Sequence, residues 1–522
     1  MTTQTARLPI AWSDSLNNLA KRFSEHVAAS DDQGLSLSFN ALNQCAHRLA
    51  HQLLENGLKP GEPIASLLPN SIQAVWASYG IRLAGATEIP LSWGYTLDEI
   101  KWCAELTKFK TILTLPTRAA PLRALGFDTL DATSLANSSL AANNFIRPLP
   151  PVPYDQSARV LFTSGTTGKP KGVLYTNGAR WLGEQLLKAT LPYVPGPGST
   201  ILLMTPFVHG ASLLAFAWLD HGARVIVHDG VNLEKIAPLL ESQSLDAIFA
   251  PPTVLAKITL ALAGEHFERV RCVFTGTQPL TPALYHRAHA MFGSKVRITF
   301  GKSECVNPIT VLGMQDTHSY FSQDVIPPGA CVGWPAAGVE IKIDAPQADQ
   351  TTEERSDGEI LLRSPHMSAG LIDDKGFRPY APEGWHHTGD LGYLDEAGRL
   401  VLTGRIADVI KTGGYRVNPD EIEVQLAANT LCTQLCVTSV ASDYWGEIIV
   451  AVAEGAHAGW QEQCEELLEG ISRHKRPRLY VATSALPRNP QGKISRKAVS
   501  KLVLATHRLE DGPYPALERL TA

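Results

Sequence analysis

The chain has 522 residues, of which 44% are hydrophobic and 19% are charged, and its formal net charge is −5. This length exceeds what one hydrophobic core usually serves, so we expect two or more domains. The composition is that of an ordinary soluble globular protein, and the net charge argues against nucleic acid or an anionic membrane surface as the main partner. Small molecules are the expected partners.

No targeting or membrane signal stands out in the sequence. The amino terminus lacks a charged segment followed by a long apolar one, and the last residues match no prenylation, peroxisomal or ER-retention motif. Residues 201–219 carry no Asp, Glu, Lys or Arg, but Pro206, His209 and Gly210 interrupt them, so a strand, a loop and a helix are expected. Eight scattered cysteines without a C-x-x-C pair are typical of reduced thiols. A cytoplasmic location is expected.

Helical and strand-like patterns alternate along the first three hundred residues. Residues 41–56 are amphipathic at helical spacing, 63–68 are strand-like and 71–85 are again helical. Strand-like runs return at 224–228, 246–250, 270–274 and 296–300. Repeated strand–helix units predict an α/β fold with largely parallel sheets covered by helices. Residues 116–156, rich in Pro, Ala, Asn and Ser, are predicted to form loop and short turns.

The pattern changes in the last third of the chain. Residues 329–405 contain short β-rich pieces separated by Gly and Pro, which predicts a small barrel or antiparallel sheet. Beyond residue 408 we expect a compact α+β unit with a helix at 420–428, strands at 434–440 and 448–453, and a helix from residue 460. The predicted organisation is therefore an N-terminal domain over 1–404, a hinge at 405–408 and a small mobile C-terminal domain over 409–522.

The most informative stretch is 161–173, Leu-Phe-Thr-Ser-Gly-Thr-Thr-Gly-Lys-Pro-Lys-Gly-Val. Its glycines free backbone N–H groups to turn toward an anion, and its hydroxyls and lysines add donors and positive charge. A P-loop needs four residues between its glycines, whereas two lie between Gly165 and Gly168, and Gly301-Lys302-Ser303 has Val296 where a P-loop needs glycine. The stretch predicts a phosphate-binding loop of another kind; a surface turn is the alternative.

Six motifs in order resemble those of the adenylate-forming superfamily, which comprises acyl-CoA synthetases, luciferases and peptide-synthetase adenylation domains. They are the phosphate loop, Thr205-Pro-Phe-Val-His-Gly, Thr299-Phe-Gly-Lys-Ser-Glu, His387-Thr-Gly-Asp, Gly404-Arg-Ile-Ala-Asp-Val-Ile-Lys-Thr-Gly-Gly-Tyr and Pro487-Arg-Asn-Pro-Gln-Gly-Lys. The resemblance covers roughly residues 30 to 500. It implies that a carboxylate attacks the α-phosphorus of ATP, giving an acyl-adenylate and pyrophosphate, before coenzyme A takes the acyl group and AMP leaves.

The resemblance also implies which residues bind ATP and Mg²⁺. The β- and γ-phosphates would be held by Thr163, Ser164, Gly165, Thr166, Thr167, Gly168 and Lys169. Glu304 would bind Mg²⁺, beside Ser303, which keeps the hydroxyl of the family's usual threonine. Asp390 and Arg405 would bind the ribose. Adenine would stack on Phe300, next to Gly301, and backbone at Gly276, Thr277 and Gln278 would run along the adenine and acyl groups, although Thr-Gln departs from the commoner Gly or Ala.

The C-terminal motifs imply a second set of roles. Lys493 matches the family lysine that reaches the α-phosphate and the acyl carboxylate and stabilises charge in transfer; a surface lysine is the alternative from local sequence. Asp408 corresponds to the hinge. Rotation there would withdraw Lys493 and bring in Lys411, Gly413 and Gly414, where a thin pantetheine arm can pass. The basic run at 474–476 would assist the coenzyme A phosphates or form a solvated surface.

The acid pocket is predicted to include Phe207, His209, Gly210, Ser212 and Lys302. Because no acidic residue occurs in 207–214, an α-amino acid is disfavoured, and fatty, aryl and short aliphatic acids stay open. The loop at 413–419 favours coenzyme A as the acceptor. The alternatives are a stand-alone ligase that loads a carrier protein, a β-lactone-forming relative and a nucleotide-binding sensor without turnover. The sequence leaves the oligomeric state open.

Overall fold

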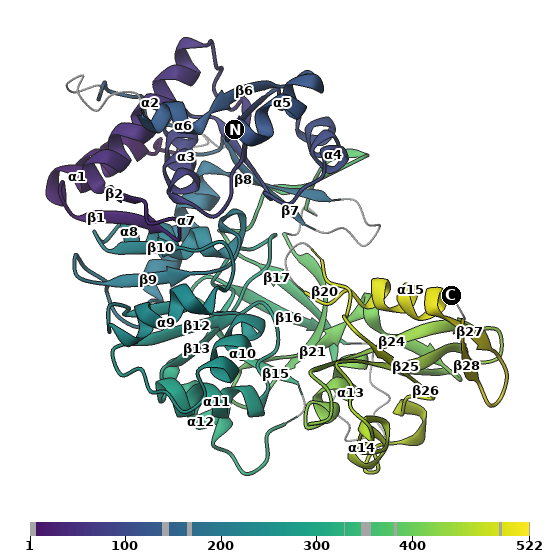
Figure 1. The fold of residues 1–522 in the computed structure, drawn as a ribbon. Helices are drawn as coiled ribbons and strands as arrows, with labels where there is room; N and C mark the ends of the chain where they lie inside the picture. The colour runs from purple at the N-terminus through teal and green to yellow at the C-terminus, as the bar shows by residue number, and fades with distance from the viewer. Residues whose placement is uncertain are drawn as a thin grey trace, which may run out of the picture.

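The computed structural model describes residues 7–137, 146–163, 170–327, 329–345, 357–380, 384–489 and 493–520. Their strands form sheets of thirteen, eight, five and two strands, and helices flank the large sheets (Figure 1). This architecture confirms the predicted α/β class. In the part of the chain so described, no helix is both long and apolar enough to cross a membrane.

The eight-stranded sheet is built mainly by the N-terminal residues, in the order β19-β18-β8-β7-β4-β3-β5-β6. Neighbours from β4 to β6 run parallel, and β8 turns back against β7. Its strands are β3 Pro63–Leu67, β4 Thr87–Leu91, β5 Thr111–Thr114, β6 Asp128–Asp131, β7 Ser157–Thr163, β8 Lys171–Thr176, β18 Gly370–Asp373 and β19 Gly376–Pro379. The helices of this part are α1 Trp12–Arg22, α2 Phe39–Glu55, α3 Ile72–Leu83, α4 Leu97–Thr107, α5 Pro116–Ala124 and α6 Ala132–Asn137.

The prediction that 116–156 is loop was wrong for its first half, which holds α5, β6 and α6. Pro116 occupies the first turn of α5, where a missing N–H is tolerated. The strand β6 is short and acquires its place by pairing with β5. Elements this short show little hydrophobic periodicity, so composition alone misled the prediction.

The thirteen-stranded sheet has a parallel half and an antiparallel half. The parallel half contains the neighbouring strands β1, β10, β9, β11, β12 and β13. In the other half, all neighbouring strands from β13 through β14, β15, β21, β20 and β17 to β16 pair antiparallel. The antiparallel sheet predicted for 329–405 is thus part of this larger sheet. The strands are β1 Val27–Asp31, β2 Ser36–Ser38, β9 Thr200–Leu203, β10 Arg224–Val227, β11 Ala247–Phe249, β12 Cys272–Gly276, β13 Val296–Phe300, β14 Thr310–Leu312, β15 Ala330–Pro335, β16 Glu340–Asp344, β17 Gly358–Arg363, β20 His386–Leu394 and β21 Leu400–Arg405. Its helices are α7 Asn177–Ala189, α8 Ser212–Leu219, α9 Leu233–Glu241, α10 Pro252–Ala261, α11 Pro282–Phe292 and α12 Met314–Phe321.

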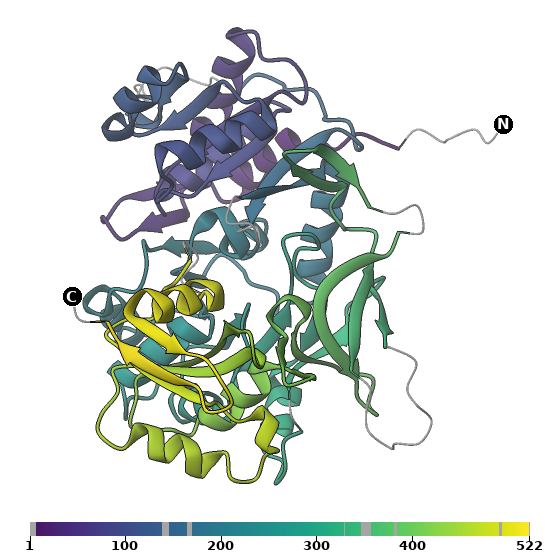
Figure 2. The same ribbon diagram turned by 90° about the vertical axis from the view of Figure 1, so that its right-hand side faces the viewer.

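Residues after 408 form their own five-stranded sheet with its own hydrophobic clusters. This part lies against the large sheet in both ribbon views, coloured green to yellow (Figure 2). It contains β22 Ile410–Thr412, β23 Tyr415–Val417, β24 Gln434–Ser442, β25 Gly446–Glu454, β26 Leu479–Thr483, α13 Pro419–Leu426, α14 Trp460–Leu467 and α15 Arg496–Thr506, followed by the hairpin β27 His507–Glu510 and β28 Ala516–Arg519. The exact domain limits and the hinge stay predictions.

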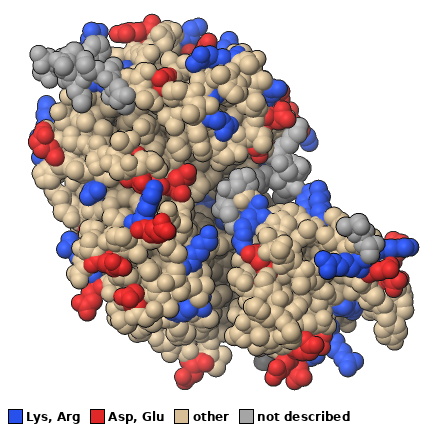
Figure 3. Space-filling view, viewed as in Figure 1, with Lys and Arg blue, Asp and Glu red and all other residues tan. Residues whose placement is uncertain are grey.

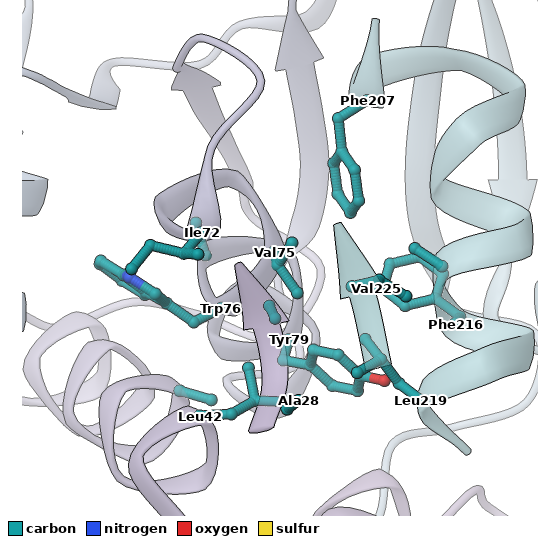
Figure 4. Close-up of a cluster of buried hydrophobic side chains, with 14 of the residues drawn as sticks. Ala28, Leu42, Ile72, Val75, Trp76, Tyr79, Phe207, Phe216, Leu219 and Val225 are labelled. Carbon is teal, nitrogen blue, oxygen red and sulfur yellow. The ribbon is translucent and has the colours of Figure 1, made fainter. Parts of the chain in front are cut away.

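A buried cluster joins the N-terminal helices to the thirteen-stranded sheet. Tyr79 of α3 packs against Phe216 of α8 and points toward Leu219, with Phe207 next to Phe216, while Trp76 of the same helix points away from α8 (Figure 4). All five are fully or almost fully buried. The cluster anchors the short helical turn Phe207–Ala211, which belongs to the second predicted motif.

Five charged side chains are buried at the same junction. Glu88 lies 2.8 Å from Arg180 and 3.5 Å from Arg159, while Glu184 lies 3.0 Å from Arg82 and 3.5 Å from Arg180. Burial by itself would raise the pKa of Glu88, but Arg159 and Arg180 outweigh it and lower that pKa. Glu88 is therefore held ionised, and the network ties β4 and α3 to β7 and α7.

Candidate active site

The predicted site residues gather where the sheets meet the C-terminal part of the chain. Gly276 is the last residue of β12 and Phe300 is the last residue of β13. Because these strands are adjacent and parallel, both residues lie at the same edge of the sheet. Asp390 and Arg405 are direct partners across the antiparallel pair β20 and β21. Figure 3 shows a furrow between the C-terminal part and the rest, with Lys and Arg side chains along it.

Asp390 is the acidic centre of this group. Its Oδ2 accepts a hydrogen bond from Lys302 Nζ at 2.6 Å, and its Oδ1 lies 3.0 Å from Arg405 Nε. Lys302 Nζ also donates to Thr388 O at 2.9 Å. The Asp390 side chain is 8% exposed, whereas that of Arg405 is 61% exposed. The carboxylate is thus fixed in place, while Arg405 is free to turn toward a ligand. The predicted pocket residue Lys302 has its ammonium at Asp390 in this structure.

The backbone at Gly276 and Thr277 is unusual. Gly276 has φ 155°, and a Cβ added there would lie 2.2 Å from Thr299 O, so no larger residue fits. Thr277 has φ 70°, the left-handed region that a β-branched residue seldom adopts. Strain of this kind persists only where the surrounding structure holds it, and it is common at ligand sites. The turn points the carbonyl of Thr277 toward Lys493.

Lys493 reaches this turn from the C-terminal part. Its Nζ donates to Thr277 O at 2.8 Å, and its own N–H donates to Asn489 Oδ1 at 3.0 Å. Burial is the main cause that lowers the pKa of Lys493 to about 8; Arg405 and Lys302 contribute to this lowering, and Asp390 opposes it. A lysine of this kind is charged at neutral pH but loses its proton easily. Its ammonium interacts electrostatically with Asp390, Arg405 and Lys302.

The loop that carries Glu304 is pinned by neighbouring segments. Tyr175 Oη donates to Ser303 O at 2.6 Å and accepts from the Val306 N–H at 3.1 Å. Ser368 N donates to Glu304 O at 2.9 Å. The Glu304 side chain is partly exposed. Mg²⁺ in nucleotide sites is commonly held by one or two carboxylates together with phosphate oxygens, and Glu304 is placed to supply one.

The described residues contain no cluster of three or more His, Cys, Asp or Glu side chains that could bind a metal ion without a ligand's help.

Cys305, next to Glu304, is buried, and its Sγ lies 3.5 Å from His366 Nε2. Burial raises the pKa of its thiol to about 12. This cysteine is therefore a packing residue at neutral pH.

The predicted phosphate loop connects β7 to β8. Thr163 is the last residue of β7 and pairs with Lys171 of β8. After the loop, Pro170 O accepts a hydrogen bond from Trp102 Nε1 at 2.8 Å. The predicted phosphate-binding residues Ser164, Gly165, Thr166, Thr167, Gly168 and Lys169 lie outside the described residues.

The residues predicted for the acid pocket fall into two groups. Gly210 lines a small cavity with a volume of about 10 Å³, whose other lining residues are Leu187, Leu213, Leu214, Phe249, Phe274, Arg297, Thr299 and Asn307. Phe207 instead packs in the core against Phe216. Ser212 is fully buried, where its Oγ donates to His209 O at 2.8 Å and accepts from Arg159 Nη1 at 3.2 Å.

His209, in the same turn Phe207–Ala211, is half-buried. Burial is the main cause that lowers its pKa to about 4, and the charges of Arg159 and Lys493 contribute to this lowering. The imidazole is therefore neutral at neutral pH.

The segment predicted to guide the acyl acceptor forms the turn between β22 and β23. The Lys411 N–H donates to Glu447 Oε2 at 2.7 Å, and the Gly413 N–H donates to Trp445 O at 2.9 Å. Gly413 and Gly414 have φ 56° and 85°, which glycine adopts without strain. The ring of Tyr415 next to them stacks on His474, with centroids 4.1 Å apart. The turn and the basic run at 474–476 are thus neighbours.

The predicted hinge residue Asp408 is bound to the C-terminal part. Its Oδ2 accepts from Arg496 Nη1 at 2.8 Å, and Arg496 also pairs with Asp420 and Glu423. Burial alone would lower the pKa of Arg496, but Glu423, Asp420 and Asp408 raise it well above its usual range. The permanently charged Arg496 therefore holds Asp408, the last residue of the 405–408 segment, against the C-terminal part of the chain.

Two features of the site were not identified from the sequence. One is the ion pair between Lys302 and Asp390, which are 88 residues apart. The other is Arg297, which lies fully buried in β13 and lines the cavity. A charged residue inside the run Val-Arg-Ile-Thr-Phe was a signal that could have revealed the second one.

One family model and several known proteins are similar to this chain. A family model described as AMP-binding enzyme matches residues 16–372. A 2-succinylbenzoate–CoA ligase of Listeria monocytogenes is 26% identical over 90% of this chain and 95% of its own length. A medium-chain fatty-acid–CoA ligase of Escherichia coli is 27% identical over 94% of this chain and 90% of its own length. The crystal structure of ATP-bound MatB from Rhodopseudomonas palustris shares the fold, with a TM-score of 0.80 at 22% identity over 94% of this chain and 98% of that one.

Proposed function

Because the chain belongs to the AMP-binding enzyme family, we propose that it is an ATP-dependent carboxylic acid:CoA ligase. In the first half-reaction a carboxylate oxygen attacks the α-phosphorus of ATP, and pyrophosphate leaves as the acyl-adenylate forms. In the second, the coenzyme A thiolate attacks the acyl carbon and AMP leaves. The observation that carries the proposal is the contact of Lys493 with Thr277, which brings a C-terminal lysine beside Asp390 and Arg405.

The nucleotide would be held from two sides. Asp390, buried and already fixed by Lys302, would accept hydrogen bonds from the ribose hydroxyls, and the exposed Arg405 would close over the sugar. The adenine would stack on Phe300, which ends β13 and is 9% exposed. Residues 163–169 would hold the outer phosphates. Bound Mg²⁺, with Glu304 as a ligand, would neutralise phosphate charge during transfer.

Lys493 would act on the first half-reaction. The positive charge of its Nζ lies at the strained Thr277 turn, where the α-phosphate and the incoming carboxylate would meet. A fixed cation stabilises negative charge that develops in the transition state, which typically contributes factors of about 10² to 10³ in rate. The neutral His209 nearby does not compete for that negative charge.

The second half-reaction would need Lys493 to leave. The turn at Lys411, Gly413 and Gly414 is now held by Glu447 and Trp445 within the C-terminal part. Rotation of that part about Asp408 would carry the turn toward the adenylate and open a path for the pantetheine arm. The names of the two CoA ligases that match most of this chain support coenzyme A as the acceptor.

Pyrophosphate release across a panel of carboxylic acids, measured with and without coenzyme A, tests the proposal. We expect acid-dependent release in both conditions and thioester only when coenzyme A is present. Adenylate that accumulates without thioester would favour a separate carrier protein as the acceptor. A cyclic product, formed when a nucleophile within the acyl group attacks its own adenylate, would favour β-lactone formation. ATP binding without release from any acid would favour a sensor and overturn the proposal.

A further inference from the structure

Lys302, two residues after β13, carries a nearly buried cation that binds Asp390. Its Nζ donates to Asp390 Oδ2 at 2.6 Å and to the backbone oxygen of Thr388 at 2.9 Å. These two acceptors lie two residues apart on β20. The side chain of Lys302 is 12% exposed and that of Asp390 is 8% exposed. Because both groups are largely shielded from water, each charge depends on the other for its compensation.

Asp390 has a second cation, Arg405, which differs from Lys302 in its surroundings. Arg405 Nε lies 3.0 Å from Asp390 Oδ1, but its side chain is 61% exposed. It is also the first residue of the predicted hinge segment 405–408. Water and salt weaken an ion pair that has an exposed partner. Lys302 is therefore the better shielded of the two cations that hold the carboxylate.

The segment that carries Lys302 is fixed by contacts within the N-terminal part of the chain. The Lys302 N–H donates to Cys305 O at 3.0 Å. Tyr175 Oη on β8 donates to the backbone oxygen of Ser303, the next residue, at 2.6 Å. The backbone from which Lys302 reaches Asp390 is thus held on both of its sides.

The other end of the contact is held by β17. Thr388 Oγ1 donates to Ile360 O at 2.7 Å and accepts from the Asp390 N–H at 3.0 Å. The residues of these contacts all precede residue 405 in the chain. Rotation of the C-terminal part about Asp408 would therefore leave the contacts intact.

Lys302 can stay at Asp390 when a nucleotide binds. A carboxylate has about four lone-pair sites, so Asp390 can accept from Lys302 and Arg405 and still accept from two hydroxyl groups. Lys302 does not line the small cavity at Gly210, although the sequence had grouped it with the acid pocket. Its contacts place it with the residues expected to bind the ribose.

We propose that Lys302 is a positioning residue for the nucleotide, which holds the Asp390 carboxylate in place for the ribose hydroxyls through both half-reactions. This inference rests on the proposed function and adds a residue to the nucleotide site. Arg405 adds to the hold in the conformation seen here, whereas Lys302 also keeps it after the C-terminal part has rotated. The adenylate then stays in place while coenzyme A attacks it.

The first experiment compares two nucleotides on two proteins by calorimetry. Lys302→Met removes the ammonium and keeps a long unbranched side chain. Loss of a charge-assisted contact predicts that Kd for ATP rises roughly 10- to 100-fold. For 2′,3′-dideoxy-ATP, which has no hydroxyl groups for Asp390, Kd should be nearly the same in the wild-type protein and the variant. A loss of overall structure would instead weaken both nucleotides equally.

Two further variants complete this comparison. Lys302→Arg keeps the positive charge and should recover part of the affinity for ATP. Lys257→Met, at an exposed position of α10, is the matched control and should bind both nucleotides as the wild-type protein does.

The second experiment follows Lys302→Met through the reaction. Its KM for ATP in adenylation and its KM for supplied acyl-adenylate in thioester formation should both rise roughly 10- to 100-fold. Its KM for the acid should stay close to that of the wild-type protein, because the acid does not contact the Lys302 ammonium.

Each outcome has a defined meaning. An unchanged Kd for ATP in Lys302→Met, or an equal loss for ATP and its dideoxy analogue, overturns the inference. A KM that rises for the acid alone places Lys302 in the acid pocket and also overturns it, as does an unchanged KM for the acyl-adenylate.

The binding comparison needs no turnover, so it is separate from the test of the ligase. ATP binding without pyrophosphate release from any acid overturns the proposed function, and the two nucleotides still decide whether Lys302 acts through the ribose. If Lys302→Met fails to fold, as judged by its melting curve, Lys302→Gln, which keeps a donor without the charge, is measured with the same nucleotides and the same criteria.

Discussion

Replacing Lys493 by alanine separates the two half-reactions. In the structure Lys493 reaches from the C-terminal part of the chain to the turn at Thr277, and its Nζ lies 2.8 Å from the carbonyl oxygen of Thr277. Removing one charged donor from a site of developing charge costs about 3 to 4 kcal/mol, or roughly 10² to 10³ in rate. We expect adenylate formation to fall by that factor, while thioester formation from supplied acyl-adenylate changes little, because Lys493 would be withdrawn in that step.

The perturbed pKa of Lys493 adds a second signature. With a pKa of about 8 the lysine is charged below that pH and loses its charge above it. The value of kcat/KM for adenylation should therefore decline as pH rises through about 8. Lys493→Arg, which stays charged, should be slower but should lose this decline.

Adenylation is measured by pyrophosphate exchange and the second step by thioester formation from synthetic acyl-adenylate. Lys501→Ala, an exposed lysine on α15 in the same part of the chain, is the control and should behave as wild type in both assays. Equal loss in the two half-reactions of Lys493→Ala would refute the assigned role. An adenylation profile that is flat through pH 9 would refute the link to its pKa.

Three further predictions concern other parts of the account. Asp390→Asn removes the charge that would bind the ribose, so the KM for ATP should rise roughly 10- to 100-fold with a smaller change in kcat. Asp408→Pro, which fixes φ, should spare adenylation but block thioester formation, whereas Asp408→Ala, which removes only the carboxylate, should spare both half-reactions. Glu88→Gln leaves Arg159 and Arg180 short of a buried counterion and should destabilise by about 3 to 5 kcal/mol in urea unfolding, with the exposed Glu241→Gln as control. Because the folded pKa of Glu88 is lowered from 4.5, its stabilisation is present above pH 4.5 and is lost as pH falls through the folded value.

Local pattern predicted most of the regular elements. The helix at 41–56 and the strand at 63–68 lie within a residue or two of α2 and β3. Such segments are long or strongly periodic, and their ends carry capping residues: Ser38 Oγ accepts from Ala41 N at 3.2 Å. The order of the six motifs predicted the family, which the AMP-binding match confirms.

Contacts between segments that are distant in the chain could not be predicted from the sequence. Nothing local places Lys302 at Asp390 rather than in the acid pocket, because the contact depends on how β13 and β20 are arranged. The same holds for Arg297, whose neighbours come from α7 and β12. In both cases the hydrogen-bond partners of the charged side chain come from segments that only the tertiary fold brings close.

The most direct measurement follows the products of one reaction mixture of protein, ATP, Mg²⁺, coenzyme A and a panel of acids by mass spectrometry. The account predicts AMP, pyrophosphate and acyl-CoA in equal amounts for at least one acid, and acyl-adenylate when coenzyme A is left out. ADP and phosphate in place of AMP and pyrophosphate, or AMP formed without any dependence on the acid, would contradict it.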